Sequence, residues 1–314
     1  MIQKLIIKGK KELVGKISIS GSKNATLPIL AATILANKVK LKNVPLVKDI
    51  FTMVKLLNFI GLNTKFLKSK NILEIKNTEK NINTLAPYKL VKTMRAGVLV
   101  LGSLLAKYGN AKVSLPGGCA IGTRPVDLHL FALKKLGAKI KIKNGYILAE
   151  AKKGLKGATI KFPTISVGAT ENALLAAFMA KGKTVLKNCA IEPEVKDLII
   201  FLRKLGRNIK ISQRIISINE NRIKKKIVNH KIIFDRIEAG TYMIASALIG
   251  KKIIIDKIDP KIIKSEIDIL KKMGVNVKKK SNSVIIKKNK KLRKINVVTR
   301  PYPGFPTDLQ AQLM

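Results

Sequence analysis

A pattern of apolar and polar residues recurs four times along the chain. Each copy is a short amphipathic stretch that ends at a glycine and leads into alternating residues: LNFIGLNT at 57–64, LKKLGAKI at 133–140, LRKLGRNI at 202–209 and LKKMGVNV at 270–277. The spacing before the glycine predicts a helix, the glycine suits a left-handed helix end, and the alternation predicts a strand. Successive glycines lie 76, 69 and 68 residues apart, which indicates a repeated supersecondary unit.

A second type of helix, apolar on most of its faces, precedes each of these copies. Its four sequences are GSKNATLPILAATILA, MRAGVLVLGSLLA, VGATENALLAAFMA and IEAGTYMIASALI. Helices that are apolar all round are buried, and strands at 39–45, 183–189 and 252–258 follow three of them. The predicted repeat is therefore βαβαββ, about 70 residues long, in an α/β fold whose helices are buried and whose sheets face solvent.

The last segment, FPTDLQAQLM at 305–314, opens a fifth repeat that has no strands after it. Repeat arrays need complete terminal units to cover their apolar faces. We therefore expect the sequence to be truncated, as a fragment or as the product of a shortened gene; a natural stop with a frayed tail is the alternative. Because so short a helix is marginal by itself, we expect Asp308 to be poorly held.

Length and composition restrict the class of protein. The chain has 314 residues, enough for two domains, and 46% of them are hydrophobic, which excludes a disordered chain. Its longest nearly unbroken apolar stretch, 96–106, is too short to span a bilayer, and no secretory signal opens the chain. Two cysteines form neither a disulfide framework nor a four-thiolate zinc site; Cys189, in an apolar run, is typical of a structural cysteine. These features predict a cytoplasmic protein with no membrane partner.

The formal net charge is +45, from 63 Lys and Arg against 18 Asp and Glu. Such a charge attracts nucleic acids, membranes and anionic metabolites alike. The lysines are spread along the whole chain and accompany abundant Ile and Asn, whereas a nucleic-acid footprint is a concentrated patch. Only 4% of the residues are aromatic, so few side chains can stack on single-stranded bases. We interpret the charge as a base-composition bias and expect no nucleic-acid partner; a basic RNA-binding protein is the rival hypothesis.

The segment LPGGCAIGTRPVDLH at 115–129 holds several groups that can take part in chemistry. Its Pro-Gly-Gly start predicts a loop, and the basic chain around that loop would stabilise the thiolate of Cys119. Arg124 can hold a phosphate or carboxylate in a bidentate fork. From the residues alone, Cys119 is either a reactive or an inert thiol, Asp127 is either functional or a helix cap, and His129 is either functional or a surface histidine.

Four other segments lie at the starts of apolar helices, where backbone N–H groups favour anions. They are SGSKNATLP at 20–28 with Lys23 and Asn24, KTMR at 92–95 with Arg95, SVGAT at 166–170, and PTD at 306–308 with Asp308. Taken singly, the segment at 20–28 is also explained as an ordinary capped helix with a solvated lysine, and Asp308 as an acidic residue that stabilises a helix start. Because equivalent ends of repeats gather at one place in a fold, together they predict a site for a multiply anionic ligand, with Cys119 and Asp308 as its acid–base groups.

Seven segments together resemble one enzyme family. They are SGSKNATLPIL, APYKLVKTMRAG, LPGGCAIGTRPVDLHL, SVGATENALLAA, EPEVKDLIIFLRKLG, FDRIEAGTY and PYPGFPTDLQAQ, and they occur in this order. From Lys8 to Met314 the chain is similar to the UDP-N-acetylglucosamine 1-carboxyvinyltransferases. The related shikimate-pathway transferases share the fold but lack the Cys loop.

This resemblance implies a fold and a reaction. The fold is an α/β, inside-out barrel of repeated βαβαββ units in two domains. The reaction transfers the enolpyruvyl group of phosphoenolpyruvate to the 3′-hydroxyl of UDP-N-acetylglucosamine and releases phosphate, which is the first committed step of peptidoglycan synthesis. The family requires no organic cofactor and no metal, so the implied partners are these two small-molecule substrates.

The resemblance also implies roles for particular residues. Lys23 and Asn24 would bind phosphoenolpyruvate, Cys119 would donate a proton and form a covalent adduct with it, and Asp308 would be the carboxylate beside the reacting hydroxyl. The residues implied in binding the sugar nucleotide are Arg95, Arg124, Pro125, Val126, Asp127, Leu128, Thr164, Ile165, Ser166, Val167 and Asp308. Many relatives have Lys where this chain has Thr164, a departure from the family pattern that bears on one phosphate contact.

The family pattern also divides the chain. It implies a nucleotide-binding domain with the Cys loop at 21–231, and a second, truncated domain at 1–20 plus 232–314. The family has six repeats, whereas this chain has four and the start of a fifth, so we expect an exposed apolar flank on the second domain. A separate C-terminal fragment would be its partner if the other repeats are made apart. A catalytically impaired remnant that still binds UDP-N-acetylglucosamine is the alternative function.

Overall fold

Two compact units make up the chain in this computed structural model, which describes Ile6, Gly9 and residues 12–78, 81–117, 126–220, 227–288 and 291–314. The large unit runs from Gly21 to Ile233, and the small unit joins Met1–Ser20 to Phe234–Met314. The sequence reading placed these boundaries after residues 20 and 231. Among the described residues, no helix combines the length and the apolar character needed to cross a membrane.

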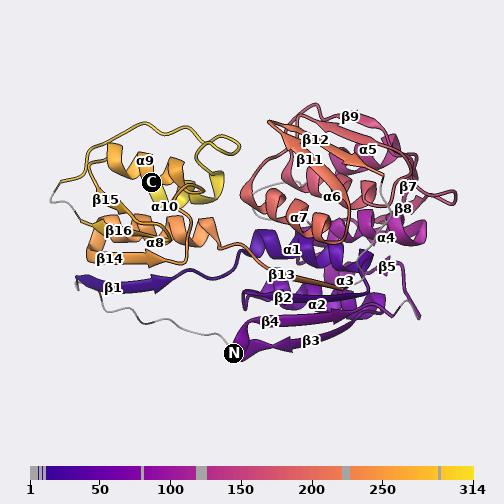
Figure 1. Cartoon of the computed structure of the whole chain (residues 1–314), viewed down its shortest axis with the longest axis horizontal. Helices are drawn as coiled ribbons and strands as arrows, with labels where there is room; N and C mark the ends of the chain where they lie inside the picture. Colours follow the sequence, from indigo (N-terminus) through magenta and orange to yellow (C-terminus); the bar gives the residue numbers. More distant parts are fainter. Residues whose placement is uncertain are drawn as a thin grey trace. The chain divides into compact units, whose positions relative to one another are not determined.

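Four βαβαββ repeats follow one another along the chain (Figure 1). The first consists of β1 (Leu13–Ser18), α1 (Lys23–Ala32), β2 (Lys38–Lys42), α2 (Lys48–Ile60), β3 (Asn63–Leu67) and β4 (Ile72–Lys76). The second consists of β5 (Leu85–Ala86), α4 (Val100–Tyr108), β6 (Asn110–Ser114), α5 (Asp127–Lys135), β7 (Lys139–Lys143) and β8 (Tyr146–Glu150). The third consists of β9 (Thr159–Lys161), α6 (Val167–Ala177), β10 (Thr184–Lys187), α7 (Pro193–Lys204), β11 (Asn208–Ser212) and β12 (Ile215–Asn219). The fourth consists of β13 (Ile227–Lys231), α8 (Arg236–Ile249), β14 (Gly250–Asp256), α9 (Lys264–Lys272), β15 (Asn276–Lys279) and β16 (Ser283–Lys287). The predicted repeat is therefore confirmed.

Each repeat turns at the glycine that the sequence pattern singled out. Gly61, Gly137, Gly206 and Gly274 have φ values of 112°, 94°, 107° and 90°. A side chain is strained in this left-handed region, so glycine ends the helix there and releases the chain into the next strand. The predicted left-handed helix ends are confirmed.

Within the described residues the strands form four four-stranded sheets, with strand orders β1-β14-β16-β15, β13-β2-β4-β3, β5-β6-β8-β7 and β11-β12-β10-β9. In the second and third repeats the first strand pairs in parallel with the next strand of its own repeat, as β5 with β6 and β9 with β10. The other two repeats exchange this strand. β13 pairs in parallel with β2, and β1 pairs in parallel with β14. The small unit therefore contains the first strand of the chain.

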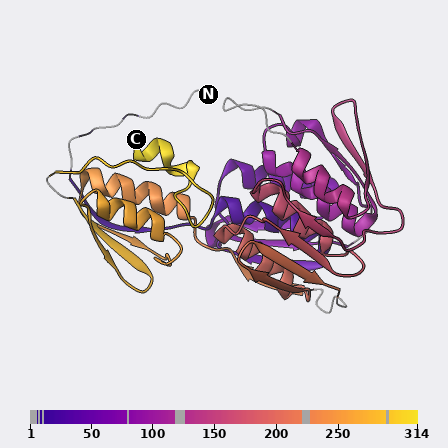
Figure 2. The same ribbon diagram turned by 90° about the horizontal axis from the view of Figure 1, so that it is seen from above.

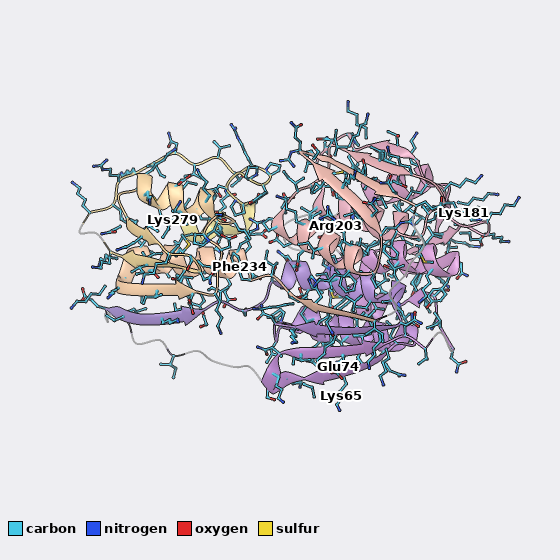
Figure 3. The ribbon with its side chains drawn as sticks, viewed as in Figure 1. Lys65, Glu74, Lys181, Arg203, Phe234 and Lys279 are labelled. Atoms are coloured by element: carbon cyan, nitrogen blue, oxygen red, sulfur yellow. The ribbon has the colours of Figure 1, made fainter. Side chains whose placement is uncertain are left out.

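Apolar helices fill the interior of the large unit. Ala25–Ala32 of α1, Val100–Leu105 of α4 and Ala169–Ala177 of α6 are buried throughout. Figure 1 shows α1, α6 and α7 between the sheet of β2–β4 and the sheet of β9–β12. The outer faces of the sheets are polar: Lys65 and Glu74 are opposite each other on β3 and β4 (Figure 3). Buried helices and solvent-facing sheets thus match the predicted arrangement.

The second apolar helix differs from its predicted form. The sequence predicts one helix over 94–106, but a 3₁₀ segment, η3 (Arg95–Leu99), precedes α4. Short 3₁₀ turns are common at helix starts. Other short segments are η1 (Thr33–Leu35), η2 (Lys68–Lys70) and α3 (Tyr88–Val91).

In the small unit, α8 and α9 cover one face of the sheet, as Figure 2 shows. The last residues form a 3₁₀ turn, η4 (Thr307–Leu309), followed by a four-residue helix, α10 (Gln310–Leu313). The expectation of a poorly held segment is wrong here. Leu309 is fully buried and packs against α8, so tertiary contact replaces the stability that so short a helix lacks.

Candidate active site

The start of α1 places Lys23 at the edge of the large unit's helical core. Ser22 caps the helix by accepting a hydrogen bond from the Ala25 N–H at 3.2 Å, as its position before an apolar run predicts. The Lys23 ammonium lies 3.4 Å from the Asp49 carboxylate at the start of α2. Asn24 is half-buried. A half-exposed lysine thus lies at a capped helix start, the kind of position at which proteins bind anions.

Gly21 fixes where α1 begins. A Cβ atom at this position would lie 1.7 Å from the backbone oxygen of Asn43, so only glycine fits. The next residue, Ser22, donates its N–H to the Ile233 oxygen at 2.8 Å, and the Asn43 side-chain amide donates to the Ile232 oxygen at 3.0 Å. The start of α1 is thus held by the backbone at 232–233 and by the close approach of Asn43.

The start of α6 carries the residues at 164–167. Ser166 caps this helix by accepting a hydrogen bond from the Ala169 N–H at 3.3 Å. Thr164 and Val167 are exposed, while Ile165 and Ser166 are half-buried. The first turn of α6 therefore presents a capped helix start with an accessible rim, the geometry in which backbone N–H groups bind anions.

His129 joins the start of α5 to the start of α6. The residue is 4% exposed, and its Nδ1 lies 3.1 Å from the side-chain nitrogen of Asn172 on α6. A Cβ atom on Gly168 would lie 3.1 Å from Cε1 and 3.2 Å from Nε2 of His129, so that edge of the ring faces the first turn of α6. The neighbouring Asp127 is exposed and Leu128 is half-buried. Two segments predicted from sequence to bind the nucleotide are thereby brought together.

The hydrogen bonds of Asn172 fix the state of this histidine. The Asn172 carbonyl oxygen accepts the Gly102 N–H at 2.8 Å, so the amide NH₂ group faces His129 and donates to Nδ1. Burial, and secondarily the charge of Arg95, lowers the pKa of His129 to about 4. At neutral pH the ring is therefore uncharged and carries its hydrogen on Nε2, the atom that faces Gly168.

Arg95 and Glu171 complete the charged groups around this edge. Arg95 is exposed at the start of η3, and α1, η3 and α6 pack against one another. Glu171 is buried, and among the residues that the structure describes its Oε1 has no hydrogen-bond partner. Burial, followed by Glu194 and Glu192, raises the pKa of Glu171 well above its ordinary value, while Arg95 opposes this rise. Burial therefore favours the neutral form of the Glu171 carboxyl group, and Arg95 is an exposed cation at the start of η3.

In the small unit, Asp308 is exposed on η4. The residue after it, Leu309, is buried beside Gly240 of α8, where a Cβ atom on Gly240 would lie 2.3 Å from Leu309 Cδ1. The carboxylate therefore projects from a turn that is fixed by its neighbour.

Comparison with known proteins identifies the family. The chain matches the family described as EPSP synthase (3-phosphoshikimate 1-carboxyvinyltransferase) over residues 7–314. It is 58% identical to the UDP-N-acetylglucosamine 1-carboxyvinyltransferase of Pelagibacter ubique (strain HTCC1062) and 48% identical to that of Rickettsia prowazekii (strain Madrid E). Both similarities cover 100% of this chain and 75% of the relative. The chain belongs to the UDP-N-acetylglucosamine 1-carboxyvinyltransferase family. It is thus a transferase.

Solved structures of enolpyruvyl transferases share the fold of this family member. The enolpyruvyl transferase NikO from Streptomyces tendae superposes with a TM-score of 0.86 at 22% identity, over 97% of this chain and 72% of that one. An EPSP synthase from Acinetobacter baumannii superposes with a TM-score of 0.68 at 19% identity, over 90% of this chain and 66% of that one. The enolpyruvyl-transferase fold expected from the sequence is confirmed.

Three residues predicted for the site of this transferase, Cys119, Arg124 and Pro125, lie outside the described residues. Val126 is described and is buried. Cys189, which follows β10 in the chain, is fully buried, and burial raises the pKa of its thiol to about 12. Such a thiol is protonated and poorly reactive at neutral pH.

Sequence reasoning did not single out Asn172 or Glu171. Their only signal was the presence of polar residues inside the apolar run VGATENALLAA, because a buried polar residue needs a partner. Within the part of the chain that the structure describes, no group of three or more His, Cys, Asp or Glu is placed to hold a metal ion.

Proposed function

We propose that this family member transfers the enolpyruvyl group of phosphoenolpyruvate to the 3′-hydroxyl of UDP-N-acetylglucosamine and releases phosphate. The observation that carries the proposal is 58% identity along 100% of the chain with a relative named for this reaction. Identity of this extent does not favour the alternative of an impaired remnant. The same resemblance supports a role in peptidoglycan synthesis, and with it in cell shape and division, in the cytoplasm.

Features of the large unit support the proposal that the protein binds two anionic substrates. Lys23 at the start of α1 and Arg95 at the start of η3 supply positive charge, and the capped start of α6 supplies backbone N–H groups. The two substrates repel each other because both carry several negative charges, so the site must compensate that charge before they react. Because His129 is uncharged at neutral pH, it adds no positive charge, and in this proposal Lys23 and Arg95 supply the charge that compensates the substrates.

The chemistry requires one acid and one base. The 3′-hydroxyl oxygen bonds to C2 of phosphoenolpyruvate while the hydroxyl loses its proton and C3 gains one. Phosphate then leaves C2, and C3 gives up a proton, so the carbon–carbon double bond returns. In this proposal Asp308 is the base beside the hydroxyl, and Cys119 is the acid that also forms the adduct with phosphoenolpyruvate. Arg124, Pro125, Asp127 and Leu128 would hold the sugar nucleotide, together with residues 164–167. A separately made C-terminal polypeptide as a further partner stays a prediction.

A phosphate-release assay tests the proposal. The purified chain is incubated with phosphoenolpyruvate and UDP-N-acetylglucosamine, and the enolpyruvyl ether is identified by mass spectrometry. We expect Lys23→Ala to lower kcat/KM by more than about a hundredfold, because one charged contact to phosphate contributes about 1.5–3 kcal/mol and also positions the reactant. Lys48→Ala, at an exposed lysine that opens α2, is the matched control and should stay within about twofold of the parent.

Binding separates the alternatives. Thermal unfolding with UDP-N-acetylglucosamine, and with UDP alone for comparison, shows whether the large unit holds the nucleotide, because a ligand of the folded state raises its stability. Nucleotide binding without phosphate release would favour the impaired remnant. Absence of phosphate release from well-folded protein would overturn the proposed transfer, and absence of nucleotide binding as well would overturn the remnant too.

A further inference from the structure

The end of the chain in the small unit is held by a set of close contacts. The Arg300 N–H donates to the Phe305 oxygen at 3.0 Å, and the Gly304 N–H donates to the Pro301 oxygen at 3.0 Å, which closes the chain into a tight loop. Phe305 is 4% exposed and Leu309 is fully buried, so two apolar side chains anchor the segment on either side of Pro306–Asp308. The Gln312 amide donates to the Thr241 hydroxyl of α8 at 3.3 Å.

Gly240 lies within α8 at the point where this segment docks. A Cβ atom on Gly240 would lie 2.3 Å from Cδ1, 3.2 Å from Cδ2 and 3.3 Å from Cγ of Leu309. The leucine side chain therefore occupies the space that any other residue would need. Gly240 has no positive φ, so its backbone does not require glycine. Since glycine within a helix is less stable than alanine, close approach is the physical reason for glycine here.

The segment has little stability of its own. It consists of the three-residue turn η4 and the four-residue helix α10, both too short to persist in isolation. The position of Asp308 therefore depends on its neighbour, Leu309. The position of Leu309 depends in turn on the space that is open because Gly240 has no side chain. This chain of contacts joins the exposed Asp308 carboxylate to the buried Gly240.

We propose that Gly240 is a positioning residue for the reaction: by admitting the Leu309 side chain it sets the place of the Asp308 carboxylate. This inference rests on the proposed function, in which Asp308 is the base. A methyl group at residue 240 needs an ordinary contact of at least 3.4 Å instead of 2.3 Å, so Cδ1 of Leu309 must move by about 1 Å. Because Leu309 is fully buried, we expect its side chain to have little room to turn aside and the turn that carries Asp308 to shift with it. A shift of about 1 Å in a reacting group lowers turnover by up to about a hundredfold.

The test is a size exchange. Gly240→Ala adds a methyl group, and Leu309→Val removes both the Cδ1 and the Cδ2 atoms that it would strike. We expect Gly240→Ala to lower kcat ten- to a hundredfold with a smaller change in the KM for phosphoenolpyruvate, which binds through the large unit. The double variant should recover kcat to within about fivefold of the parent. Leu248→Ala, at an exposed position of the same helix, is the control and should leave kcat unchanged.

Hydrogen exchange of the backbone amides at 306–314 measures how firmly this segment packs against α8, and it needs no turnover. Exchange should become faster in Gly240→Ala and return toward the parent rate in the double variant. If the parent releases no phosphate, the proposed function fails, while this measurement still tests whether Gly240 places the segment. Unchanged exchange and unchanged kcat in Gly240→Ala would overturn the inference. So would a double variant that is no better than Gly240→Ala, including one that rescues neither folding nor activity.

Discussion

The neutral state of His129 gives a prediction whose size follows from the structure. Burial lowers the pKa of this ring from 6.5 to about 4, so protonating it in the folded chain costs about 3 kcal/mol more than in the unfolded chain. Because the folded pKa is depressed, the unfolded chain takes up the proton first. The contribution of His129 to stability is therefore complete above pH 6.5 and is lost as the pH falls through about 4.

At pH 5 the unfolded histidine is almost fully protonated, whereas the folded one is mostly neutral. The large unit should then have lost about 2 kcal/mol of unfolding free energy relative to pH 7.5 through this residue alone. His129→Gln cannot titrate and should lack this part of the pH dependence. Urea unfolding gives the change in unfolding free energy between pH 7.5 and pH 5 for parent and variant. The difference between these two changes is the contribution of His129, separate from that of other titrating groups such as Glu171.

Nuclear magnetic resonance of the imidazole nitrogens measures the same property directly. The chain has only 2 histidines, so a His230→Gln variant leaves the signals of His129 alone. We expect the Nε2–H form at neutral pH and a titration midpoint near 4. A midpoint close to 6.5, or a hydrogen on Nδ1, would refute both the burial argument and the hydrogen bond with Asn172.

Three further predictions concern the buried groups of the large unit. Asn172→Ala leaves the buried Gly102 N–H without its acceptor and should lower the unfolding free energy by about 1–3 kcal/mol in urea titrations; a change below about 0.5 kcal/mol would contradict it. Iodoacetamide at pH 8 should label Cys119 before Cys189, because burial raises the pKa of the Cys189 thiol to about 12, and peptide mass spectrometry that finds the reverse order disproves the assignment. Burial raises the pKa of Glu171, so its contribution to stability is present below pH 4.5 and is lost as the pH rises. Glu171→Gln should therefore gain stability relative to the parent between pH 5 and pH 8, and an equal difference at both pH values would count against a raised pKa of Glu171.

Much of the candidate site could be predicted because its signals are local. Ser22 and Ser166 stand directly before apolar runs, and a cap needs only the next three residues. The pairing of His129 with Asn172 could not be predicted in this way. The two residues are 43 positions apart, and Asn172 and Gly102 are 70 apart, so only packing of the helices brings them together. Gly240 and Leu309 meet for the same reason.

The sequence by itself determined the repeat. Four glycines at a steady period, helices apolar on most faces and alternating strands specify βαβαββ, because helix ends and strand faces depend on residues close in the chain. Only the tertiary structure decided which sheets the first strands join. β13 pairs with β2 and β1 pairs with β14, although the strand patterns of all four repeats are alike. A parallel partner is set by long-range packing rather than by a local turn, and this exchange assigns the first strand of the chain to the small unit.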